Sequence, residues 1–97
     1  MQNTREILDS IRLSKRHLAK AFKLQAVGVF GSVIRGEQRD DSDIDVLVDL
    51  DSSADLLDLI GIGLYLEERL HAKVDVVHRA ALRQEFQDQV LKEVCYL

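Results

Sequence analysis

The chain has 97 residues, of which 46% are hydrophobic and 31% charged, and its formal net charge is −4. A chain of this length builds one hydrophobic core, so we expect a single domain over residues 1–97, with no separate substrate-binding domain. The composition excludes wholesale disorder, and the lack of a signal-peptide pattern or of an apolar run near the roughly 20 residues of a membrane span predicts a cytoplasmic protein.

The first expected element is an amphipathic helix that begins after Asn3 and ends at about Phe22. Asn3 and Glu6 have the spacing of a capping box, in which each side chain bonds to the backbone of the other residue. Five apolar residues share one side of this helix and form its core side: Ile7, Leu8, Ile11, Leu18 and Phe22. Five basic residues form a separate stripe: Arg5, Arg12, Arg16, Lys20 and Lys23. We interpret this stripe as a solvated face, and the alternative is a contact surface for an acidic partner or for nucleotide phosphates.

A short buried strand is predicted over residues 26–30, because this segment is rich in β-formers and is bounded by Gly31. A tight turn or a single helical turn should follow, from Ser32 to about Glu37. Gly31 lets the backbone approach a ligand, and exposed N–H groups at a helix start attract phosphate. A polar loop over residues 38–42 then leads to a second strand over residues 44–50, which is apolar enough to be buried on nearly both faces.

The second half of the chain predicts a helix, a strand and a helix. Ser52 and Asp55 suggest a capping box that opens a helix through about Leu70. We expect its core side to consist of Leu56, Leu59, Ile60, Leu64 and Leu66. Gly61 and Gly63 weaken this helix and indicate either close packing or a break.

A third strand is expected over residues 73–77, with Asp75 as its only acidic residue. A final helix should span about residues 80–96, with Cys95 as a small buried residue inside it. The order of these elements predicts an α/β or α+β layer with at least three strands.

The candidate chemistry lies in an acidic block, since residues 37–58 contain nine acidic side chains and a single cation, Arg39. Asp43 and Asp45 are two residues apart at the start of a strand, so their side chains project side by side. Parallel carboxylates repel each other unless a cation lies between them, and hard oxygen ligands favour Mg²⁺. With Asp75 on another strand, three carboxylates could bind two divalent ions for in-line phosphoryl transfer. The alternative is an ordinary solvated loop, because an isolated Asp-x-Asp is common.

Two other phosphate- or metal-binding motifs fail on these residues. Gly31 and Gly36 have the glycine spacing of a P-loop, but Glu37 and Gln38 replace the required Lys and Ser or Thr. The acidic alternation that ends at Asp45 imitates the opening of an EF-hand, but a valine replaces the required glycine and a strand follows.

The combination of residues 31–36 (GSVIRG) and 42–48 (SDIDVLV) closely resembles the signature of the minimal nucleotidyltransferases, small members of the DNA polymerase beta superfamily. The resemblance spans essentially the whole chain, because Asp75 falls where that family keeps its third metal-binding carboxylate. It implies an α+β nucleotidyltransferase fold, with a mixed sheet of three or more strands flanked by helices. It also implies two Mg²⁺ ions held by the catalytic residues Asp43, Asp45 and Asp75.

The resemblance further implies that ATP is the substrate and that its phosphates lie near Gly31, Ser32, Arg35 and Ser42. Arg35 would contact phosphate or would fix the turn by pairing with an acidic neighbour. Asp75 would also help to deprotonate the acceptor hydroxyl.

The biological role that the resemblance implies is that of an antitoxin, which transfers AMP from ATP onto a tyrosine of a HEPN-type toxin. The alternative is a catalytically inactive antitoxin that neutralises its toxin by binding alone, and the presence of all three carboxylates favours the enzyme. The acidity and low aromatic content do not favour nucleic-acid binding. His17, His71 and His78 lack metal-ligand spacing. No membrane partner is expected, and self-association stays open.

Overall fold

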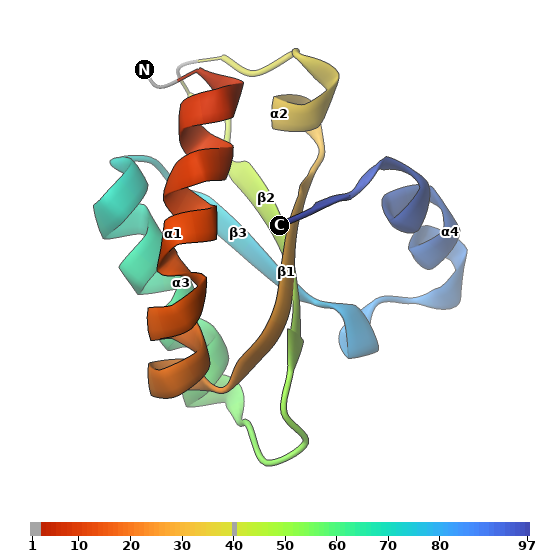
Figure 1. Cartoon of the computed structure of the whole chain (residues 1–97). Helices are drawn as coiled ribbons and strands as arrows, with labels where there is room; N and C mark the ends of the chain where they lie inside the picture. Colours follow the sequence, from red (N-terminus) through yellow and green to blue (C-terminus); the bar gives the residue numbers. More distant parts are fainter. Residues whose placement is uncertain (1–2, 40) are drawn as a thin grey trace.

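The computed structural model describes residues 3–39 and 41–97. In chain order its elements are α1 (Thr4–Phe22), β1 (Leu24–Phe30), α2 (Ser32–Arg35), β2 (Ile44–Leu50), α3 (Leu56–Leu70), β3 (Val74–His78), a 3₁₀ turn (Arg79–Ala81), α4 (Gln84–Glu93) and β4 (Cys95–Tyr96). The strands form one mixed sheet in the order β3-β2-β1-β4 (Figure 1). β2 and β3 are parallel, and β1 is antiparallel to both β2 and β4. The predicted α+β fold with a mixed sheet is therefore confirmed.

The core lies between the sheet and the helices α1 and α3, which cover the same face (Figure 1). The three predicted strands, β1, β2 and β3, match the structure to within two residues at each end, and β2 matches its predicted range. The capping box of α1 is confirmed, since the amide of Glu6 donates to the Asn3 side chain at 2.8 Å and the Asn3 amide donates to the Glu6 side chain at 3.3 Å. Ile7, Ile11 and Leu18 are buried as expected.

The start of α3 differs from its prediction. Its N-cap is Asp55, which forms a capping box with Asp58, so the proposed box of Ser52 with Asp55 is wrong. Residues 51–54 form a turn instead, in which Asp51 accepts from the amide and the hydroxyl of Ser53, both at 2.8 Å. The helix begins only after this turn has ended.

The core side of α3 was also largely mispredicted. Leu59 and Leu66 do contact the core, but the fully buried residues are Ile62 and Leu66, with Leu70 nearly so, whereas Leu56, Ile60 and Leu64 are 68%, 47% and 63% exposed. The orientation follows from the glycines. A Cβ on Gly61 would lie 2.2 Å from the Phe22 ring, so Gly61 faces α1. The close packing expected at this glycine is confirmed, and the helix has no break there.

The helix in the C-terminal segment is shorter than predicted. The expected helix over residues 80–96 is wrong at both ends, because α4 spans only Gln84–Glu93 and β4 then pairs with β1 at Gly28 and Val29. A Cβ on Gly28 would lie 2.6 Å from Val94, so the missing side chain makes room for this segment. Cys95 is therefore a half-buried strand residue rather than a helical one.

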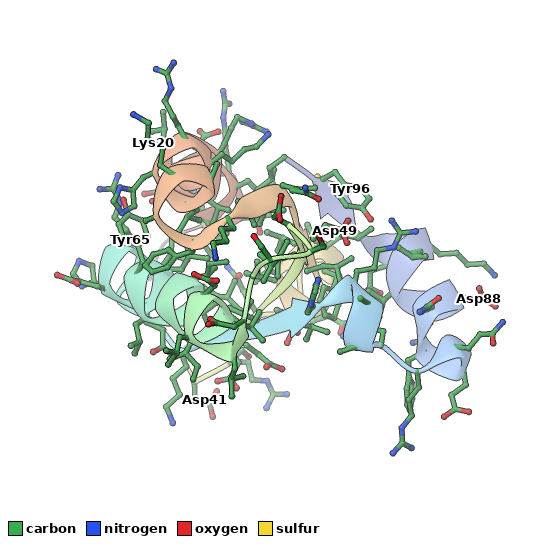
Figure 2. All side chains as sticks on the ribbon, turned by 90° about the horizontal axis from the view of Figure 1, so that it is seen from below. Lys20, Asp41, Asp49, Tyr65, Asp88 and Tyr96 are labelled. Atoms are coloured by element: carbon green, nitrogen blue, oxygen red, sulfur yellow. The ribbon has the colours of Figure 1, made fainter. Side chains whose placement is uncertain are left out.

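α4 contributes no buried residue, and Figure 2 shows its Asp88 pointing away from the sheet. Among the described residues, no helix combines the length and the apolar character that crossing a membrane would require.

Candidate active site

Two of the three candidate carboxylates are neighbours on adjacent strands. The parallel register of β2 and β3 pairs Asp45 with Asp75. Ile44, Val46 and Val48 alternate with Asp45 along β2 and point into the core beneath α1 and α3. Because successive side chains on a strand point to opposite faces, Asp45 and Asp75 lie on the face that these helices leave uncovered. The structure thus brings together residues that are thirty positions apart in sequence.

Asp43 precedes β2 and stands two residues before Asp45, as the sequence analysis expected. Asp43 and Asp75 are exposed, whereas Asp45 is half-buried. Burial raises the pKa of the Asp45 carboxyl above its ordinary value, and the negative charges of Asp75 and Asp43 raise it further. The positive charge of Arg35 partly offsets these effects. Asp43 and Asp75 are therefore both close enough to Asp45 for their charges to disfavour its ionised form.

The chemistry of this group suits a divalent cation. Carboxylate oxygens are the ligands that Mg²⁺ prefers, and a cation would relieve the repulsion around Asp45. In their present directions, however, no three carboxylate, imidazole or thiol groups among residues 3–39 and 41–97 converge closely enough to hold an ion together. An ion held by all three carboxylates would therefore need the side chains of Asp43, Asp45 and Asp75 to turn toward one another.

Gly31 lies between β1 and α2, next to Asp45. Its backbone has φ 78° and ψ −149°, a conformation that is essentially restricted to glycine. A Cβ on Gly31 would lie 2.2 Å from the Asp45 carboxylate, so this carboxylate rests against the glycine backbone. The predicted single helical turn is confirmed as α2, whose first hydrogen bonds run from Ile34 and Arg35 to the Gly31 carbonyl at 3.1 Å each.

Arg35 forms ion pairs with two carboxylates. Its Nη1 lies 3.0 Å from each carboxylate oxygen of Glu93, and its Nε lies 3.1 Å from Glu37. These contacts raise the pKa of Arg35, the Glu37 hydrogen bond most, followed by the Glu93 bond. Of the two roles expected for Arg35, pairing with an acidic neighbour is the one that the geometry shows.

Glu93 was missed in the sequence analysis. It ends α4, and its Oε1 also accepts the Gly31 amide at 2.5 Å, although 62 residues separate the two positions. No local pattern marks such a residue, because its role depends on where the last helix ends.

The two predicted serines lie on either side of the loop before β2. Ser32 is the half-buried first residue of α2, directly after Gly31. The Ser42 hydroxyl accepts the Arg39 amide at 2.9 Å, and its own amide donates to the Arg39 carbonyl at 3.0 Å. Ser42 therefore shapes the turn that leads into Asp43, and its contact with nucleotide stays a prediction.

The remaining candidates lie elsewhere. His17 stacks on Tyr65 with ring centroids 4.6 Å apart, between α1 and α3 (Figure 2). The basic stripe of α1 is exposed, with Arg12 paired to Asp9 at 3.0 Å and Lys20 pointing into solvent (Figure 2).

Comparison with known proteins shows what this chain is similar to. Residues 14–96 match the family model described as "Polymerase beta, Nucleotidyltransferase". The chain is 38% identical to the protein adenylyltransferase MntA of Thermococcus cleftensis, over 100% of this chain and 98% of that protein. A solved structure described as a candidate minimal nucleotidyltransferase superposes with a TM-score of 0.84 at 38% identity, covering 99% of this chain and 97% of the other.

A toxin-antitoxin complex solved with AMP-PNP is more distant. Its TM-score is 0.71 at 25% identity, and the match covers 98% of this chain and 72% of that one.

Proposed function

The chain belongs to the polymerase beta nucleotidyltransferase family, and we propose that it is a protein adenylyltransferase that moves AMP from ATP onto a hydroxyl of a partner protein. The observation that carries this proposal is the pairing of Asp45 with Asp75 across two parallel strands, with Asp45 resting against the turn at Gly31. The relative from Thermococcus cleftensis, a protein adenylyltransferase, matches this chain over nearly its whole length.

Each part of the site has a role in this proposal. Asp43, Asp45 and Asp75 would hold two Mg²⁺ ions, which would neutralise phosphate charge and lower the pKa of the attacking hydroxyl. Ser32 offers the triphosphate oxygens a backbone amide and a hydroxyl at a helix start. The Gly31 amide is already bonded to Glu93, so Gly31 contributes by letting the backbone approach the phosphates closely.

The transfer itself is a substitution at the α-phosphorus of ATP. The acceptor oxygen forms a bond to this phosphorus, the bond to the β-phosphate oxygen breaks, and pyrophosphate leaves. Asp75 is exposed, so an acceptor can reach it, and its carboxylate receives the proton of the hydroxyl.

The acceptor in this proposal is a tyrosine of a HEPN-type toxin, as the family resemblance implies. A toxin-antitoxin complex with AMP-PNP among the structural relatives supports a toxin partner and a nucleotide substrate. The cytoplasmic location and the single-domain organisation stay predictions.

The test is the intact mass of a cognate HEPN-type partner after incubation with the protein, ATP and Mg²⁺. We expect the mass to rise by one or more AMP groups, and chelation of Mg²⁺ should prevent the rise. A partner that is neutralised at unchanged mass would contradict the proposal and favour an antitoxin that acts by binding alone.

A further inference from the structure

Glu93 joins the end of α4 to both parts of the turn between β1 and α2. One of its carboxylate oxygens accepts the Gly31 amide, and both oxygens lie 3.0 Å from Nη1 of Arg35. The Glu93 side chain is only 21% exposed, and its charge-assisted bond from the Gly31 amide is partly shielded from water, whereas the Arg35 side chain is 45% exposed. Gly31 and Arg35, the first and fifth residues of the segment 31–35, are thus held by a single carboxylate.

The position of Glu93 is itself fixed by the sheet. The next residue, Val94, packs over Gly28, and β4 then pairs with Gly28 and Val29 of β1. The amide of Leu97 donates to the Val27 carbonyl at 2.9 Å. The backbone of Glu93 is therefore held beside the turn, within reach of Gly31 and Arg35.

The turn needs such a contact because its conformation is unusual. Gly31 has a wide range of accessible backbone angles, and in the observed conformation its backbone lies against the Asp45 carboxylate. A hydrogen bond to the Gly31 amide removes this freedom before any ligand binds. Pre-organisation of this kind increases affinity, because the cost of ordering the site has been met during folding.

We propose that Glu93 is a positioning residue for AMP transfer, which fixes the turn at Gly31 and Arg35 in the conformation that binds the nucleotide. This inference rests on the proposed function and deepens it. In the opposite role Glu93 would compete with the nucleotide, because a backbone amide and a guanidinium are also donors that phosphate oxygens use. The anchoring of Glu93 by β4 favours positioning, and the two roles predict effects of opposite sign.

The experiment compares wild type with Glu93→Ala, Glu93→Gln and the control Glu85→Ala. Glu85 lies on the same helix, is exposed, and pairs only loosely with Arg83 at 3.9 Å. The first readout is the Gly31 amide resonance in the ligand-free protein, which should shift and exchange faster in Glu93→Ala. The second is the Kd of AMP-PNP with Mg²⁺, measured by titration calorimetry well below each variant's Tm.

We expect Glu93→Ala to weaken AMP-PNP binding about tenfold or more, which corresponds to the loss of a charge-assisted hydrogen bond. Glu93→Gln keeps an acceptor for Gly31 and should fall between wild type and Glu93→Ala, and Glu85→Ala should bind like wild type. In AMP transfer the KM for ATP should rise more than kcat falls, because Glu93 does not touch the reacting atoms.

An unchanged or tighter Kd in Glu93→Ala would overturn the inference and leave the proposed function intact, since wild type would still bind the nucleotide. An unchanged Gly31 resonance would overturn it as well, without reference to any nucleotide. A wild type that binds no AMP-PNP would instead overturn the proposed function, and with it the role of Glu93 in nucleotide binding.

Discussion

Gly31→Ala should lower stability and activity more than any other substitution that adds a single methyl group to the turn between β1 and α2. The native φ of 78° and ψ of −149° cost a non-glycine residue about 1–3 kcal/mol. The new Cβ would also lie 2.2 Å from Oδ2 of Asp45, so the carboxylate or the turn must move. Together the backbone strain and the displacement should destabilise the protein by about 2–4 kcal/mol.

Gly36→Ala is the matched control, because Gly36 ends the same short helix. Its φ of 72° and ψ of 21° are left-handed, and a Cβ there would meet no atom within 4 Å. Its cost should therefore be limited to about 1–2 kcal/mol.

The assay combines urea unfolding with AMP transfer to the partner under conditions in which both variants are folded. A shift of Asp45 of about 1 Å can lower the rate about 100-fold, so Gly31→Ala should lose most of its activity and Gly36→Ala little. Equal losses in the two variants would refute the argument that Gly31 is required by the position of Asp45.

Three further predictions concern stability. Asp45→Asn should raise the Tm in metal-free buffer by a few degrees, on the order of 0.5–1 kcal/mol, because it removes repulsion at a partly exposed site. The pKa of Asp45 is higher in the folded state than its ordinary value of 3.8, so the wild-type protein should become more stable as the pH falls through the raised pKa toward 3.8. Asp45→Asn has no carboxyl to titrate and should lack this gain. An equal pH dependence of stability in the two proteins would count against the repulsion. Ile62→Ala should cost about 2–5 kcal/mol in urea unfolding and Leu64→Ala under about 1, and the reverse order would contradict the orientation of α3. Gly61→Ala should destabilise by about 1–3 kcal/mol through its clash with Phe22, and a neutral result in thermal unfolding would argue against this contact.

The local signals in the sequence predicted the elements that depend on local chemistry. The Asn3 and Glu6 capping box sets the start of α1 by itself, and the apolar run of β2 is bounded by polar residues on both sides. The spacing of Asp43 and Asp45 likewise predicts a shared face, because alternation along a strand is a local property.

The errors arose where distant contacts decide the structure. Apolar residues occur on nearly every side of α3, so periodicity alone could not identify its core face, which is set by the packing of Gly61 against Phe22. The end of α4 depends on pairing between β4 and Gly28, and no pattern within the last twenty residues reveals that pairing. Glu93 was missed for the same reason, since its partners lie 58 and 62 residues away.

The pairing of Asp45 with Asp75 depends both on local sequence signals and on distant contacts. The sequence analysis grouped the two residues as carboxylates on neighbouring strands, and the family resemblance supported this grouping, but the parallel register that makes them direct neighbours is a tertiary feature. The contact of Asp45 with the Gly31 backbone was not predicted at all, because it depends on how β1 and β2 meet at their ends.

The central claim is that the carboxylates of β2 and β3 carry out AMP transfer, and Asp49 provides the control for it. Asp49 lies four residues after Asp45, on the same strand and the same face, where it pairs with Arg79 at 3.8 Å. The decisive measurement is the intact mass of the partner after incubation with ATP, Mg²⁺ and each of Asp45→Asn, Asp75→Asn and Asp49→Asn. The account predicts no added AMP with the first two variants and a wild-type gain with Asp49→Asn. A wild-type gain with folded Asp45→Asn or Asp75→Asn would contradict it.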